Sequence, residues 1–319
     1  MTTEVVQQPV AKSSRAIAWQ RRKTSTARFL RAFSSHRTGM LGVGILVFFV
    51  LVALTAPLIF PIRLLNPNLN LDNKSLCAPS WNFYYWLGCD DLGRSVMAEL
   101  AWGARPSLIV GITASVIAMV IGTLVGIASG HFRGLFGASM ERLTDWFLVL
   151  PFVPLVIVLQ AVLGETSIWI TVAILGITSW PGTARLVRAQ TLSVEARPYI
   201  ERAKVLGNSD WAQMNRHILP NVMPLVIANT TLTVAIVVLS MTTLAFLGLF
   251  DDSIPTSGFQ VGGISWGGML DAADASGAAL LGAWWFLIPP GLCVIAIVLA
   301  FTLIGRTLEV VLNPRLGSD

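Results

Sequence analysis

Long apolar stretches, separated by shorter polar segments, dominate the pattern of residues along this chain. Six of them follow one another, at residues 38–60, 105–130, 139–163, 167–188, 220–249 and 282–307. An α-helix of roughly 20 residues crosses ~30 Å of hydrocarbon, so each stretch is long enough to span a membrane. The runs are continuous rather than alternating, and lipid offers no water to an unpaired strand edge. The pattern therefore predicts an all-α, polytopic membrane protein with six transmembrane helices.

Composition supports a membrane protein. Hydrophobic residues make up 54% of the 319 residues and charged residues 12%, too apolar a balance for one water-soluble core. The net charge of +5 is explained by topology and contact with anionic lipid, without any nucleic-acid partner. A cleaved signal peptide is the alternative for the first span. Because the apolar run at 39–60 is longer than a signal core and a basic tail of 37 residues precedes it, we expect an uncleaved helix.

The cations fall almost entirely on one side of the predicted spans. Of the 22 lysines and arginines, all but Arg63, Lys74, Arg94 and Arg105 lie in the tail at 1–37, beside the third span, around 185–216 or near the C-terminus. The positive-inside rule then places both termini in the cytoplasm and the loops at 61–104 and 250–281 outside. Aromatic and basic residues alternate late in the tail, which predicts a basic amphipathic helix in the headgroup region, with a flexible tail as the alternative.

A basic, helix-prone segment at 189–219 separates the fourth and fifth spans. Glu201, Ala203, Gly207 and the run Ile218-Leu219-Pro220 stand at the spacing of the EAA loop, through which permeases of ABC importers dock on their ATPase. Glycine suits a helix end, and proline is tolerated in a first helical turn. Arg202 replaces the first alanine of the usual Glu-Ala-Ala triplet, which alters the chemistry of docking. An ordinary basic interfacial loop is the alternative.

A second motif lies at the end of the 61–104 loop. It comprises Gly88, Asp90, Leu92, Gly93 and Arg94, a glycine-punctuated turn that leads into a helix. It resembles the entry motif of the C-type permeases of the dipeptide and oligopeptide family, although Cys89 replaces a threonine and Ser95 an aspartate. The resemblance covers residues 20–316. Further matches are Arg142, Asp145 and Pro151, and the runs at 180–188, 246–249, 266–270 and 313–316.

This resemblance implies a type I ABC importer permease fold in a prokaryotic inner membrane, with a core at 105–316. It also implies the function: half of the pathway for di- or oligopeptides, driven by ATP. The implied partners are a homologous B-type permease, two ATPase subunits or domains and an extracytoplasmic substrate-binding protein. Importers of nickel complexes, glutathione or glycosides in the same family are alternatives. An ion-coupled secondary transporter would carry more buried carboxylates or histidines and broken half-helices, and a membrane enzyme would cluster such groups within a span.

No residues are predicted to perform catalysis or to bind a metal or cofactor. The sequence has no Gly-x-x-x-x-Gly-Lys-Ser/Thr run that could hold nucleotide phosphates, so the resemblance assigns ATP and Mg²⁺ to the partner ATPase. His36, His131 and His217 are separated in sequence and are predicted to be surface or interfacial side chains. Asp145 is predicted to form an ion pair at the end of its span, with a role in gating as the alternative.

Two predictions concern covalent and polar details. Cys77 and Cys89 share the outer loop, where an oxidising compartment would let them form a disulfide; two free thiols are the alternative. Asn229, Thr233 and Ser240 are candidates for lining the pathway. Hydrogen bonds within their own helix or to a neighbour are the competing interpretation.

Overall fold

The computed structural model describes residues 27–66, 75–132, 134–163, 167–249, 254–256, 259–261 and 264–312. Within these ranges the regular elements are helices, apart from a small antiparallel hairpin of β1 (Ile254–Thr256) and β2 (Phe259–Val261). The helices are α2 (Arg37–Ile59), α3 (Val96–His131), α4 (Leu135–Val149), α5 (Phe152–Leu163), α6 (Ile168–Thr178), α7 (Trp180–Glu195), α8 (Pro198–Val205), α9 (Asp210–Gln213), α10 (Leu219–Phe246), α11 (Trp266–Ala275) and α12 (Trp284–Leu312). Short 3₁₀ turns lie at Ile62–Leu65 and Phe83–Tyr85, and a π-helical turn lies at Met214–Ile218.

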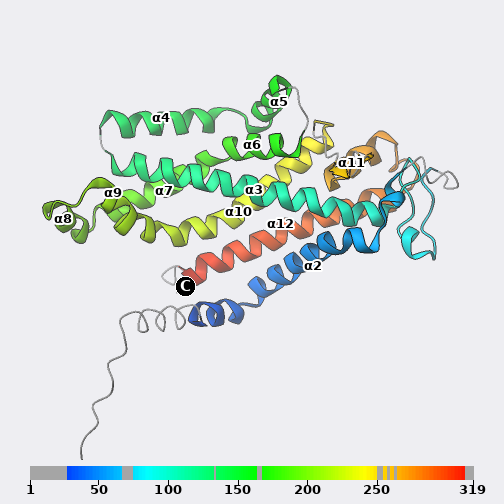
Figure 1. Ribbon diagram of the computed structural model, residues 1–319, viewed down its shortest axis with the longest axis horizontal. Coiled ribbons are helices and arrows are strands. Elements are labelled where there is room, and N and C mark those ends of the chain that lie inside the picture. The colour runs from blue at the N-terminus through cyan, green and yellow to red at the C-terminus, as the bar shows by residue number, and fades with distance from the viewer. Residues whose placement is uncertain are drawn as a thin grey trace, which may run out of the picture.

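The long helices run lengthwise beside one another (Figure 1). One end of the bundle carries α8 and α9, and the other carries α11 and the segment at 75–95. We call these the α8 end and the α11 end. A separate helix at 27–35 precedes α2, and the rings of Phe29 and Phe33 lie 6.3 Å apart on it. Part of the predicted amphipathic tail is therefore helical, while its earlier residues lie outside the described ranges.

Among the described residues, five helical stretches are long and apolar enough to cross a membrane, and a bent pair of helices would make a sixth. The bent pair is α4 and α5, which meet at 93°. The stretch predicted as one span at 139–163 is therefore bent, and it counts as a sixth span only if α4 and α5 are taken together. Pro151 explains the bend, because the residue before a proline is driven out of the α region, and Leu150 has an extended backbone with ψ 130°.

Helices α3 and α7 form the most extensive helix pair among the described residues. Every fourth residue of α3 at this contact is a glycine: Gly122, Gly126 and Gly130 face Thr183, Val187 and Thr191 of α7. A Cβ atom on any of them would come within 2.8 Å of an α7 atom. The absence of side chains lets the two backbones approach closely, which stabilises helix pairs in lipid by van der Waals packing.

The segment at 250–281 is more than an outer loop. Its helix α11 packs against α10 and α12, and Trp266 and Met269 are buried there. The Trp266 indole Nε1 donates a hydrogen bond to the Leu100 carbonyl at 3.0 Å, which ties α11 to α3. Sequence reasoning missed this helix because ten residues are too few to signal a span. At the α11 end the bundle is thus closed by a packed helix.

Candidate partner-docking site

Helix α8 has well-defined ends. Pro198 occupies its first turn, where a missing N–H costs no hydrogen bond. At the other end Gly207 has φ +78°, the Asn208 N–H donates to the Ala203 carbonyl at 3.1 Å, and the Gly207 N–H donates to the Lys204 carbonyl at 3.0 Å. This pair of bonds is the Schellman arrangement, which requires a residue with positive φ. The sequence prediction that Gly207 ends a short helix agrees with this geometry.

The two faces of α8 differ sharply. Ile200 and Ala203 are buried against the bundle, whereas Glu201, Arg202 and the apolar pair Val205 and Leu206 face outward. Val205 and Leu206 are 87% and 82% exposed and line a shallow groove together with Pro198, Glu201 and Arg202. We call these five residues the α8 surface. Ala203, which belongs to the predicted docking motif, packs inward, because the helical rotation puts it on a different face from Glu201.

After Gly207 the chain re-enters the bundle through a continuous helical stretch. Ser209 caps α9 by accepting a hydrogen bond from the Ala212 N–H, and the π-helical turn follows directly. The Leu219 N–H donates to the Met214 carbonyl five residues earlier, and Pro220 then lies in the first turn of α10. The wider turn accommodates a proline that could not continue an α-helical ladder. Ile218 is fully buried, so it anchors this turn rather than contacting a partner.

An ionic cluster joins α8 and α9 to the ends of α3 and α7. Glu195, at the end of α7, accepts hydrogen bonds from His131 Nδ1 at 2.5 Å and from Lys204 Nζ at 2.6 Å. His131 Nε2 lies 3.3 Å from an Asp210 carboxylate oxygen. The side chains of His131 and Glu195 are 3% and 4% exposed. His131 is therefore buried and is not a surface side chain, and its partner 64 residues away left no local signal.

A second ion pair lies nearby, between α4 and α7. Arg188 donates from Nη1 and Nη2 to the two Glu141 oxygens at 2.5 and 2.7 Å. The pair borders a polar cleft that Asp145 and Arg185 also line. The ion pair predicted for Asp145 is not among the ion pairs of the described residues; Glu141, one helical turn earlier on α4, pairs with Arg188 instead.

The motif at the α11 end forms a buried ion cluster. Arg94 Nε donates to Asp90 Oδ2 at 2.6 Å, and Arg94 Nη2 lies 2.9 Å from Glu99 Oε1. Asp90 also accepts from the backbone N–H groups of Leu92 and Arg94, which fixes the turn. Burial opposes the charge of Arg94, yet the carboxylates of Glu99 and Asp90 outweigh it and raise the pKa of Arg94. Sequence reasoning found Asp90 and Arg94 but missed Glu99, which is fully buried.

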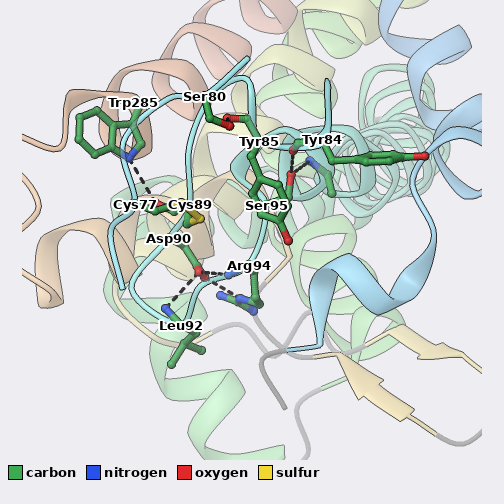
Figure 2. The surroundings of a disulfide bond; sticks show 11 residues. Cys77, Ser80, Tyr84, Tyr85, Cys89, Asp90, Leu92, Arg94, Ser95 and Trp285 are labelled. Atoms are coloured by element: carbon green, nitrogen blue, oxygen red, sulfur yellow. Dashed lines mark hydrogen bonds and ion pairs between the residues drawn. A yellow bond between two sulfur atoms is a disulfide. The ribbon is translucent and has the colours of Figure 1, made fainter. Parts of the chain in front are cut away.

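Cys77 and Cys89 form a disulfide at this same turn, with Cα atoms 4.8 Å apart (Figure 2). The Cys89 N–H donates to the Cys77 carbonyl at 2.9 Å, and the Cys89 carbonyl accepts from the Trp285 indole at 3.2 Å. Gly88 has φ +71° and lies against Trp285, so this position favours glycine. The bridge and its hydrogen bonds hold the 75–95 segment against the start of α12.

Ser95 caps α3, accepting from the Ala98 N–H at 3.2 Å while its hydroxyl donates to the Tyr84 carbonyl. An ionised aspartate at this position could not donate that second bond. Gly93 also has positive φ, at +77°. Both features fix the local geometry of this turn.

The three candidate pathway residues all bond to helices. Asn229 Nδ2 donates to the Thr183 hydroxyl at 3.1 Å, Thr233 donates to the Asn229 carbonyl and Ser240 to the Ile236 carbonyl. Their geometry therefore fits hydrogen bonding within and between helices. Lining of a pathway stays a prediction.

Comparison with known proteins gives two matching family models and several relatives. The family model described as binding-protein-dependent transport system inner membrane component matches residues 122–318, and that of the N-terminal TM domain of oligopeptide transport permease C matches residues 24–79. A dipeptide transport system permease protein of Bacillus subtilis is 32% identical over 286 residues, which cover 90% of this chain and 84% of that protein. An oligopeptide transport system permease protein of Haemophilus influenzae is 32% identical, covering 89% and 87%. A glutathione transport system permease protein of Pectobacterium atrosepticum is 33% identical, covering 73% and 74%.

Proposed function

Because the chain belongs to the family of binding-protein-dependent transport system inner membrane components, we propose that it forms half of the pathway of an ATP-driven peptide importer. The curated relatives named for dipeptides and oligopeptides cover most of this chain, which supports peptides as the transported class. The chain lies in the bacterial inner membrane and crosses it several times. A homologous permease would supply the other half of the pathway.

The observation that carries the proposal is the α8 surface. A short helix with defined ends presents two large apolar side chains, Val205 and Leu206, almost fully to solvent beside the charges of Glu201 and Arg202. Such an apolar pair with a polar rim is typical of a protein-protein contact. We propose that this surface docks on the ATPase subunit, with the α8 end in the cytoplasm as the cation distribution predicts.

In this proposal the ATPase subunits and the substrate-binding protein lie at opposite ends of the bundle. ATP and Mg²⁺ would be bound by the two ATPase subunits, and this chain would transmit their movement without performing the hydrolysis. A substrate-binding protein would approach the α11 end, where the bridged 75–95 segment exposes Trp81 and Trp86. Specificity would then depend largely on that binding protein.

Docking is tested by placing a charge on the α8 surface. Val205→Asp and Leu206→Asp should leave membrane insertion intact, since both side chains already face solvent, and should abolish copurification of the ATPase subunits. Leu280→Asp is the matched control, because Leu280 is 94% exposed at the α11 end. Full retention of the ATPase by both α8 variants would disprove the docking assignment.

The substrate class is tested with the complete transporter in vesicles. Uptake of labelled dipeptides and longer peptides should exceed uptake of glutathione, which is the second candidate because a glutathione permease is among the relatives. Identification of the ligand carried by the binding protein provides an independent measurement. Uptake of glutathione alone would replace the peptide assignment while keeping the importer.

A further inference from the structure

His131, Glu195 and Lys204 connect α3, α7 and α8 through hydrogen bonds, and we call this cluster the ionic joint. We propose that His131 is a positioning residue, which locks the docking helix α8 to α3 and α7 so that movement of the ATPase reaches α3. This inference rests on the docking function proposed above, and it names the route by which the movement leaves α8.

Helices α3 and α7 pack closely enough to move as one body. Glycines at 122, 126 and 130 let the helices touch over three successive contacts, ending at Gly130 against Thr191. His131 follows Gly130 directly, and Glu195 lies one helical turn beyond Thr191. The His131–Glu195 bond thus continues the same helix contact at its end, where small side chains give way to a charged hydrogen bond.

Glu195 also holds α8 through Lys204. One of its oxygens accepts from His131 and the other from Lys204, which lies in the last turn of α8. The three residues come from α3, α7 and α8, so a single carboxylate fixes the docking helix relative to both long helices. Removing one member of such a network can cost more stability than the loss of a single pairwise contact.

His131 also contacts α9. Its two ring nitrogens face carboxylate oxygens on different elements, Nδ1 facing Glu195 of α7 and Nε2 facing Asp210 of α9. Asp210 begins α9, so the same ring also contacts the start of the stretch that leads into α10.

The connection from α8 to α10 has an irregular backbone. It passes through Gly207, whose φ is positive, and then through the π-helical turn at Met214–Ile218. A π turn inside a helix is a local weakness in the regular hydrogen-bond ladder. In this proposal, movement of the ATPase passes from α8 to α3 and α7 through the ionic joint. The π turn lets α8 change its position relative to α10.

The experiment compares two replacements of His131 in the complete transporter. Leucine fills a similar volume without an N–H group, whereas glutamine retains a donor for Glu195. In vesicles, His131→Leu should hydrolyse ATP at near the normal rate while peptide uptake per ATP falls roughly tenfold, which corresponds to about 1.4 kcal/mol. His131→Gln should restore most of the uptake per ATP. His36→Leu, a half-buried histidine at the start of α2, is the control and should match the wild type.

The outcomes separate the joint from the docking surface. ATPase copurification should be unchanged in His131→Leu; its loss in Val205→Asp tests docking independently. Normal uptake per ATP in His131→Leu would overturn the joint, because it would show that filling the space is enough. Equal losses in the leucine and glutamine variants would also overturn it, because a donor to Glu195 would then restore nothing. If His131→Leu does not reach the membrane, Lys204→Met decides, since Lys204 is 42% exposed and its loss should not prevent folding. Normal uptake per ATP in that variant would equally overturn the proposal.

Discussion

Gly126→Ala should destabilise the protein, although alanine favours helices more than glycine does. An added Cβ would lie 2.6 Å from the Ala184 carbonyl oxygen and 2.7 Å from Val187 Cβ. Ordinary contacts begin near 3.4 Å, so α3 and α7 would have to separate by about 0.8 Å. Because one of the obstructing atoms belongs to the backbone, rotation of a side chain cannot relieve the overlap. Overpacking of this kind costs about 1–3 kcal/mol.

The control isolates this steric cost from helix propensity. Gly44 lies within α2, and a Cβ there would meet no described atom within 4 Å. Gly44→Ala should therefore be neutral or stabilising by up to about 1 kcal/mol, the propensity difference between the two residues. The free energy of unfolding of both variants is measured by titrating detergent-solubilised protein with sodium dodecyl sulfate. Equal stability of the two alanine variants would refute close packing of α3 on α7.

Three further predictions follow from the charged and covalent features. Arg94→Met should destabilise the protein by about 3–5 kcal/mol, because it leaves Asp90 and Glu99 buried without their cation, and the same titration checks it. Reduction of the Cys77–Cys89 bridge, or replacement of both residues by serine, should cost roughly 3 kcal/mol for a loop with a sequence separation of 12; recovery of both residues as alkylated thiols without prior reduction would contradict the bridge. Cysteines introduced at Ser209 and Leu281, in a Cys293→Ser background with the bridge intact, should react with impermeant maleimide from opposite sides of the membrane, and labelling from one side would contradict the predicted topology.

Sequence reasoning located the spans because hydrophobicity is a local property of each stretch. It also located the end of α8, since a glycine with positive φ is required by a local hydrogen-bond pattern. It did not anticipate the bend at Pro151, where one backbone preference divides the stretch into α4 and α5. Apolar composition alone does not distinguish a straight span from a bent pair.

The charged clusters could be predicted only in part. Asp90 and Arg94 are four residues apart, and their pairing lies within one motif. Glu99 completes the cluster from within α3, and His131 meets Glu195 across 64 residues. Such contacts depend on how α3 packs against its neighbours, which no sequence pattern at either residue specifies.

The two charged clusters lie near opposite ends of the same helix, and this placement explains how α3 can carry them. From Glu99 to His131 the helix rises about 48 Å at 1.5 Å per residue, longer than the ~30 Å of hydrocarbon and close to the full thickness including headgroups. Both clusters would therefore lie at the level of the headgroups, where a charge costs much less than at the bilayer centre. The apolar, glycine-rich middle of α3 then crosses the hydrocarbon while each end is fixed by ion pairs to a different part of the chain. A helix held in this way would move as a rod, which is the property that the proposed joint at His131 requires.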